Sequence, residues 1–316
     1  MNYMNFTTSS MAVATKTKIL DVAIIGSGPA AFTAAIYAAR ENLSAAVYER
    51  EAIGGLTSTI SKIENYPGFS GTGAALMQHM RAQAESFGAA TEYGECTAVK
   101  KLKNHFELTI DDLPIKAKTV IIATGSDRRK LGIPGEDLPA VSYCATCDGP
   151  LVTGKKVIVI GGGNSAVQES FYLLKYAKSV TIISRSGLSS NDVLKERVAK
   201  EPRITVITGF SPVEFIAKNG KFSGVKCSSK NNTTETFPAD AAFIFIGMVP
   251  ATSFLPKEIL ETDGSVKTKP DFSTDIPGLF AAGDCRAGNI KQTIVAAGEG
   301  ASAAVSAGKY LENLEK

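Results

Sequence analysis

The most constraining feature of this chain is a strand–turn–helix pattern that occurs twice. The segments KILDVAIIGSGPAAFTAAIYAARE (18–41) and KKVIVIGGGNSAVQESFYLLKYAK (155–178) both open with the aliphatic run of a buried parallel strand. Each continues into a glycine-rich turn of the form G-x-G-x-x-A. The first glycine bends the chain, the second lets a pyrophosphate approach the backbone, and the small third residue lets the helix pack against the strand. Two matches in the same context predict two dinucleotide sites in one chain.

Other apolar runs predict the rest of the fold. Runs that end at or near a glycine predict further strands at 119–126, 241–250 and 278–285, and residues 293–314 predict a closely packed helix rich in small side chains. We therefore expect an α/β fold of two Rossmann-like dinucleotide-binding domains, of the three-layer ββα type, with the second domain inserted in the first.

The domain boundaries follow from this layout. We expect an FAD-type nucleotide domain formed by residues 19–126 and 248–316, and an inserted domain at 127–247 that carries a cysteine pair. Residues 1–18 are rich in serine and threonine, and they lack arginine and a long apolar core. We expect them to form a disordered tail rather than part of a transit peptide.

Composition narrows the class of protein. The net charge of +3 is too small to indicate a nucleic-acid or membrane-surface partner. No apolar run reaches the roughly 18 residues needed to cross a bilayer. Five cysteines are too few and too scattered for a secreted disulfide framework, which favours a cytoplasmic protein. With only two histidines, His79 and His105, no metal site is expected.

An acidic residue about 20 positions past the glycines normally binds the adenosine ribose. In the first unit this position is Glu49, at the end of the apolar run AAVY. In the second unit the position holds Ser184, followed by Arg185, and no carboxylate is present. An arginine there favours the 2′-phosphate of NADP, but a surface arginine after a strand is equally expected.

The segment SYCATCDGP (142–150) holds Cys144 and Cys147, followed by Asp148. Such a pair can be half a zinc site, a redox-active disulfide or two structural thiols. Zinc needs four ligands, and the chain offers only three further cysteines, all isolated and expected to be core residues: Cys96, Cys227 and Cys285. A Cys-x-x-Cys pair beside a βαβ unit therefore favours redox chemistry.

Together these motifs resemble those of the low-molecular-weight thioredoxin reductases over nearly the full length of the chain. The matching segments are GSGPAA (26–31), ENYPG (64–68), ATG (123–125), CATCDG (144–149), GGGNSA (161–166), GLFAAGDC (278–285) and KQT (291–293). The resemblance implies FAD in the first domain, a redox-active disulfide in the second, a homodimer, and thioredoxin or a similar disulfide protein as the substrate.

Carried over by position, the resemblance also implies the site residues. Glu49 would bind the adenosine ribose, Asp284 the ribityl chain, and Lys291 stands where the family usually has arginine. The implied FAD-site residues are Gly26, Ser27, Gly28, Pro29, Ala30, Ala31, Glu49, Arg50, Gly54, Gly55, Leu56, Asn65, Thr124, Gly125, Gly283, Asp284, Lys291, Gln292 and Thr293. A second nucleotide would meet Gly161, Gly163, Asn164, Ser165 and Arg185.

The resemblance implies that electrons pass from a donor through FAD to the Cys144–Cys147 disulfide. Cys147 would lie nearer the flavin, and Cys144 would attack the external disulfide. Asp148 would act as acid and base, while its plain structural alternative is a helix N-cap. Because the cysteines must face the flavin in one state and the substrate in another, the inserted domain is expected to rotate about its linkers.

The chain departs from the family in one place. NADPH-using members carry a His-Arg-Arg…Arg cluster that grips the 2′-phosphate, whereas SRSGLSS (184–190) keeps only Arg185 and has Ser186 and Ser190 in place of other arginines. Losing two charge-assisted contacts should weaken binding by several kcal/mol by order of magnitude. This argues against NADPH and favours ferredoxin, or a second flavin nucleotide in the GGGNSA turn, as the donor.

The alternative functions are an ordinary NADPH-dependent thioredoxin reductase, a dithiol oxidase that uses oxygen, and a non-enzymatic flavin-binding scaffold.

Overall fold

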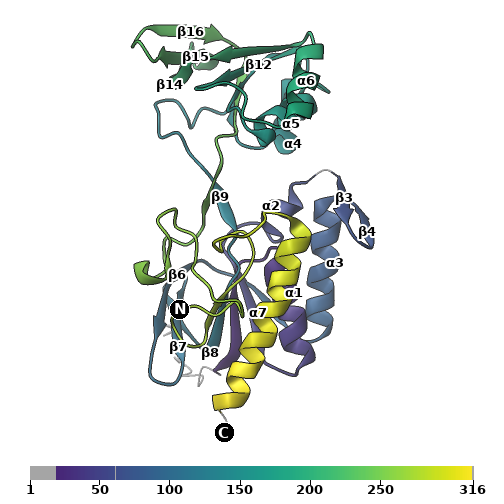
Figure 1. Ribbon diagram of the computed structural model, residues 1–316, viewed down its shortest axis with the longest axis vertical. Coiled ribbons are helices and arrows are strands. Elements are labelled where there is room, and N and C mark those ends of the chain that lie inside the picture. Colours follow the sequence, from purple (N-terminus) through teal and green to yellow (C-terminus); the bar gives the residue numbers. More distant parts are fainter. Residues whose placement is uncertain (1–18, 61, 315–316) are drawn as a thin grey trace, which may run out of the picture.

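The computed structural model describes residues 19–60 and 62–314, and the tail predicted at 1–18 lies outside the described residues. The chain forms two bodies stacked along its long axis and joined by a narrow junction (Figure 1). No helix in the described part of the chain is long and apolar enough to cross a membrane.

The larger body, which we call the cofactor body, is built on a seven-stranded sheet. Its strand order is β5-β2-β1-β8-β7-β6, with β19 also paired to β8. The bounds are β1 (Leu20–Ile25), β2 (Ala45–Glu49), β5 (Ala90–Tyr93), β6 (Cys96–Lys101), β7 (Phe106–Ile110), β8 (Leu113–Ile122) and β19 (Leu279–Ala281). The pairs of β1 with β2 and β8, of β2 with β5, and of β19 with β8 are parallel, and β6, β7 and β8 form an antiparallel meander. The central aliphatic runs are buried, as strands covered on both faces require.

Three helices lie side by side against the sheet of the cofactor body (Figure 1): α1 (Pro29–Arg40), α3 (Gly73–Ser86) and α7 (Thr293–Leu314). The bounds of α7 match the helix predicted at 293–314. Helices α1 and α7 approach closely because a glycine stands at the contact: a Cβ on Gly300 would lie 2.1 Å from the carbonyl oxygen of Ala30. Short elements complete this body: α2 (Gly55–Ser58), β3 (Ile63–Tyr66), β4 (Phe69–Gly71) and η2 (Lys257–Ile259).

The smaller body, the inserted body, has a parallel five-stranded sheet in the order β10-β17-β11-β12-β13. An antiparallel sheet, β14-β15-β16, and the helices α5 and α6 complete its layers. The bounds are β10 (Val141–Ser142), α4 (Ala145–Asp148), η1 (Gly149–Val152), β11 (Lys156–Ile160), α5 (Asn164–Leu173), β12 (Ser179–Ser184), α6 (Asp192–Lys200), β13 (Ile204–Thr208), β14 (Phe210–Lys218), β15 (Lys221–Ser229), β16 (Thr234–Pro238) and β17 (Ala241–Ile244). Apolar clusters lie on both faces of the five-stranded sheet, so this body has a core of its own.

The chain passes between the two bodies along β9 (Ser126–Arg128) and returns along β18 (Met248–Pro250). These two strands pair with each other in antiparallel register, from Met248 opposite Arg128 to Pro250 opposite Ser126. We call this pair the junction ribbon. The junction ribbon lies close to the two domain boundaries that the sequence predicts. The exact boundaries, between residues 126 and 127 and between 247 and 248, stay a prediction.

Candidate active site

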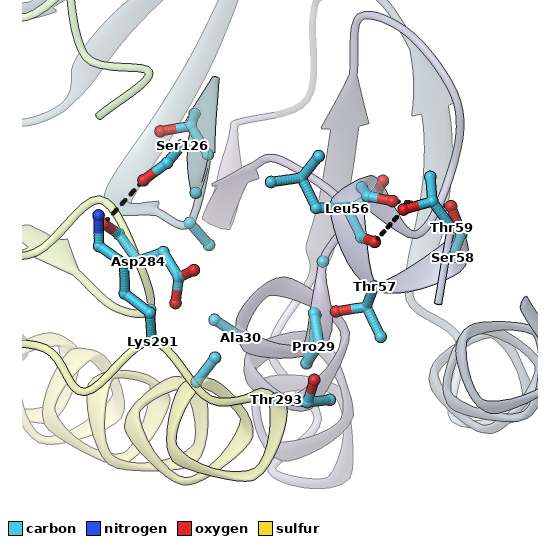
Figure 2. Close-up of a pocket in the computed structure, with 18 of the residues that line it drawn as sticks. Pro29, Ala30, Leu56, Thr57, Ser58, Thr59, Ser126, Asp284, Lys291 and Thr293 are labelled. Carbon is cyan, nitrogen blue, oxygen red and sulfur yellow. Dashed lines mark hydrogen bonds between the residues drawn. The ribbon is translucent and has the colours of Figure 1, made fainter. Parts of the chain in front are cut away.

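A cleft of about 580 Å³ opens at the carboxyl ends of the parallel strands in the cofactor body (Figure 2). An adjoining cavity of about 460 Å³ shares Glu49, Arg50, Thr124 and Asp127 with it and reaches Gly26, so the two together suit an extended ligand. The predicted FAD-site residues that line the cleft are Ser27, Gly28, Pro29, Ala30, Glu49, Arg50, Gly55, Leu56, Thr124, Gly125, Gly283, Asp284, Lys291, Gln292 and Thr293.

Hydrogen bonds hold three parts of the cleft wall together. The Ser27 hydroxyl donates to Oε2 of Glu49 at 2.5 Å, and the Gly54 N–H donates to the Ser27 oxygen at 2.9 Å. The first glycine turn, the end of β2 and the loop before α2 are therefore linked. Ala31 does not line the cleft, because its side chain is fully buried in the core between helix and sheet.

The opposite wall of the cleft carries charge. The Asp284 carboxylate points into the cleft, with Lys291 beside it, and the Ser126 hydroxyl donates to the Asp284 carbonyl at 3.1 Å (Figure 2). Burial raises the pKa of Asp284, and Lys291 opposes this shift. Asn65 does not line the cleft, but its Nδ2 donates to Oε1 of Gln292 at 2.9 Å, so the structure brings these two predicted residues together.

Cys144 and Cys147 form a disulfide at the start of α4. The Cys147 N–H donates to Sγ of Cys144 at 3.1 Å, so Cys144 caps the helix. Cys144 is buried and Cys147 is exposed. The Thr146 hydroxyl, between them, donates to the carbonyl of Thr59 in the cofactor body at 2.7 Å. The redox pair predicted from the sequence therefore lies at the contact between the two bodies.

A cavity of about 380 Å³, which we call the junction cavity, lies beside this contact. Cys144 lines it together with Thr59 and Ile60, which also line the cofactor cleft. Of the described residues, Ser165 of the second glycine turn lines both cavities, whereas neither cysteine lines the cofactor cleft.

The second glycine turn has the predicted shape. A Cβ on Gly161 would lie 2.2 Å from the Phe245 carbonyl, and Gly163 precedes α5 with no side-chain cap. The segment after β12 folds onto this turn: the Ser189 N–H donates to the Gly162 carbonyl at 2.8 Å, and the Asn191 N–H donates to Oδ1 of Asn164 at 2.9 Å. Arg185 is exposed and does not contribute to these contacts.

Known proteins resemble this chain along almost all of its length. The family model described as pyridine nucleotide-disulphide oxidoreductase matches residues 20–300. The chain belongs to this family. A thioredoxin reductase from Listeria monocytogenes is 39% identical over 311 residues, which cover 96% of this chain and 98% of the relative.

Solved structures agree with this assignment. Thioredoxin reductase from Lactococcus lactis, in its FR conformation, has a TM-score of 0.86 and 36% identity over 93% of this chain and 99% of that chain. A ferredoxin-flavin thioredoxin reductase from Clostridium acetobutylicum has a TM-score of 0.54 and 28% identity over 94% and 99%. The predicted α/β fold with two dinucleotide-binding domains is confirmed. Like its relatives in the pyridine nucleotide-disulphide oxidoreductase family, the chain is an FAD-dependent, thioredoxin reductase-like disulfide oxidoreductase.

The cleft of this family member fits FAD. Gly28 precedes α1 without a side-chain cap, and no acidic residue lies in the first turn of that helix, so the N–H groups there are left for an anion such as a pyrophosphate. No atom lies within 4 Å of the Cβ position of Gly28, so the backbone is open to close approach. The Glu49 carboxylate stands at the end of β2, where the adenosine ribose is bound in such folds.

The structure does not support the structural alternative for Asp148, that its side chain caps a helix N-terminus. Its side chain caps no helix; instead, its Oδ2 accepts a hydrogen bond from Ser142 at 2.6 Å. The Ser142 oxygen also accepts from the Cys144 N–H at 2.9 Å, so this buried serine connects the carboxylate to the disulfide. Sequence reasoning missed Ser142, although its place two residues before Cys144 was the available signal.

Sequence reasoning also missed Arg128 and Glu169, which line the junction cavity. Glu169 follows the buried residue Ala166 by three positions and precedes the buried Leu173 by four, so an acidic residue on the apolar side of the helix was the available signal. Within the described residues, no group of three or more histidine, cysteine or acidic side chains could hold a metal ion.

The other cysteines are buried, as predicted. Burial raises the pKa of Cys96 and of Cys227 to about 12 and that of Cys285 to about 11, so these thiols stay protonated at neutral pH. We expect the native oxidised protein to react negligibly with Ellman's reagent. The dithiothreitol-reduced, desalted protein should gain two reactive thiols, with the exposed Cys147 reacting faster than the buried Cys144. Fast thiols in the oxidised protein would contradict this assignment.

Proposed function

We propose that this chain reduces a thioredoxin-like protein disulfide through Cys144 and Cys147, with a donor other than NADPH. The choice of donor depends on the conformation and the charge of the segment at the end of β12. The Ser184 hydroxyl donates to the Gly187 carbonyl at 2.7 Å, and Ser189 and Asn191 bond to the second glycine turn. Arg185 is the one cation of segment 184–190, so this segment offers a 2′-phosphate a single charged partner.

When bound, FAD supplies the electron pair that opens the Cys144–Cys147 disulfide. The Cys144 thiolate then attacks one sulfur of the substrate disulfide, and the other substrate sulfur leaves as a thiolate, which Asp148 protonates. The Cys147 thiolate next attacks Cys144, restores the disulfide and releases the second substrate sulfur. That sulfur also leaves as a thiolate and takes its proton from solvent, so the substrate gains two electrons and two protons, one from Asp148 and one from water.

Motion of the inserted body belongs to this proposal. Cys144, the proposed attacking sulfur, is buried in the described arrangement, and neither cysteine is among the described residues that line the cofactor cleft. Rotation about the junction ribbon would bring the disulfide to the cleft in one state and expose Cys144 in the other. The predicted site residues, the homodimer and a cytoplasmic location remain part of the proposal, and the family relationship supports the first two.

Ferredoxin is the favoured donor, because a relative named as a ferredoxin-flavin thioredoxin reductase shares the architecture over 94% of this chain. A second flavin nucleotide in the GGGNSA turn is the other candidate. One observation favours the conventional NADPH-dependent alternative: Ser165 of that turn lines the cofactor cleft, so a nucleotide held there would lie close to it.

Stopped-flow bleaching of the bound flavin tests the donor. We expect NADPH and NADH to bleach it more slowly than about 0.1 s⁻¹, an order of magnitude below the usual range of turnover numbers, and reduced ferredoxin to bleach it within that range. The variant Ser186→Arg, which adds a cation beside Arg185 at an exposed position, should accelerate bleaching by NADPH.

Fast bleaching of the unaltered protein by NADPH would rule out the proposed donor in favour of the conventional reductase. Counting flavins per chain after gentle purification separates the two remaining candidates: one flavin supports ferredoxin, and two support a second flavin nucleotide.

A further inference from the structure

Two side chains of opposite charge line the junction cavity, one from the junction ribbon and one from the inserted body. Arg128 belongs to β9 of the junction ribbon, and Glu169 belongs to α5 of the inserted body. Both are half-buried, and both lie in the wall that also holds Cys144. The electrostatic attraction between this cation and this carboxylate therefore links the junction ribbon to the inserted body that would turn about it.

Arg128 is held on the side of the cofactor body. Its neighbour Asp127 accepts a hydrogen bond at 2.6 Å from Nη2 of Arg50, which follows β2. The backbone of β9 is further fixed by its pairing with β18. Arg128 therefore has an anchored backbone, and it lines both the cofactor cleft and the junction cavity.

Glu169 is held on the other side by the packing of α5 against the sheet of the inserted body. Its Oε2 is buried and has no hydrogen-bond partner among the described residues. Burial raises the pKa of Glu169, and the charge of Arg128 opposes that shift. Burial lowers the pKa of Arg128, and Glu169 and Asp148 oppose this in turn.

Arg128 and Glu169 attract each other over a separation longer than that of a salt bridge. The two side chains are not within salt-bridge distance of each other. In a half-buried cavity such an attraction is screened less than at the surface, and it offsets part of the cost of burying each charge. A turn of the inserted body would carry Glu169 away from Arg128 and remove this compensation.

We propose that Arg128 is a positioning residue that, by facing Glu169 across the junction cavity, holds the inserted body in the described arrangement. This inference rests on the proposed function, since it concerns the motion that brings the disulfide to the cofactor cleft. Holding the body in place keeps both cysteines out of the cleft lining and slows the uptake of electrons by the disulfide. The pair thus sets how the chain divides its time between arrangements.

A double-mutant cycle with Arg128→Gln and Glu169→Gln tests the pair. The holoprotein is photoreduced under argon, and the return of oxidised-flavin absorbance reports the uptake of electrons by the disulfide. We expect each single variant to speed this return about two- to fivefold, the usual range for a partly exposed charge pair, and the double variant to be no faster than either. Arg129→Gln is the matched control, because Arg129 is the exposed next residue and should leave the rate unchanged.

Three readouts separate positioning from a general structural effect. Arg128→Lys, which keeps the charge, should behave like the unaltered protein. Added salt should speed the return in the unaltered protein and leave the double variant unaffected, because salt screens the pair. Small-angle X-ray scattering should fit the described arrangement worse for Arg128→Gln and Glu169→Gln than for Arg129→Gln.

Two outcomes would overturn the inference in distinguishable ways. If the unaltered protein never regains oxidised-flavin absorbance, the disulfide takes no electrons, and the proposed function falls together with the positioning role. If the absorbance returns but Arg128→Gln and Glu169→Gln match Arg129→Gln in rate and scattering, the positioning role alone is wrong.

Discussion

Replacing Cys147 with serine is expected to lower the turnover of a thioredoxin-type disulfide substrate roughly 10³-fold or more, because no second sulfur is left to resolve the mixed disulfide. The same variant should accumulate a covalent adduct between Cys144 and the substrate, visible by mass spectrometry and released by dithiothreitol. Flavin content should not change, since Cys147 does not line the cofactor cleft.

Cys227→Ala is the matched control, because Cys227 is a fully buried cysteine of the same body with no part in the disulfide. We expect it to retain turnover per folded molecule. Retained turnover in Cys147→Ser would contradict the assignment of the redox pair. An adduct that forms on Cys147 in Cys144→Ser, and not on Cys144 in Cys147→Ser, would reverse the roles of the two sulfurs.

Replacing Gly26 with alanine is expected to cost about 3 kcal/mol or more of unfolding free energy. Gly26 has a φ of +103°, and an added Cβ would lie 2.3 Å from the Ala123 carbonyl oxygen, which belongs to the backbone and cannot move aside. Urea unfolding of the apoprotein measures this cost. Loss of bound flavin should accompany it, because the turn itself is displaced.

Gly28→Ala separates ligand approach from folding at the same turn. Gly28 has an ordinary φ of −73°, and nothing lies within 4 Å of its Cβ position, so the stability of the apoprotein should change by only about 0.5 kcal/mol. FAD affinity should nevertheless fall about tenfold or more, because the methyl group stands where the pyrophosphate approaches. Equal flavin affinity in the unaltered protein and in Gly28→Ala would show that the cofactor lies elsewhere.

Features fixed by local pattern could be predicted from the sequence. The glycine turns before α1 and α5, the strand that ends at Glu49 and the bounds of α7 all depend on residues close together in the chain. The disulfide belongs to the same class, since its cysteines are separated by a single helical turn.

Features set by the placement of one body on the other could not be predicted. The hydrogen bond from Thr146 to Thr59 joins residues 87 positions apart, and the shared cavity of Arg128 and Glu169 depends on how the junction ribbon exits the cofactor body. Neither contact leaves a periodic pattern in the sequence. The burial of Cys144 beside an exposed Cys147 is of the same kind, because it follows from packing at the contact between the bodies.

The antiparallel pairing of β9 and β18 has an evolutionary consequence. Because the outgoing and returning strands are hydrogen-bonded neighbours, everything between them enters and leaves at one point, with Arg128 opposite Met248. A lineage can therefore exchange or remodel the whole intervening module through two adjacent splice points without disturbing the sheet below. Chimaeras that graft this module between relatives at the ribbon should fold as readily as their parents.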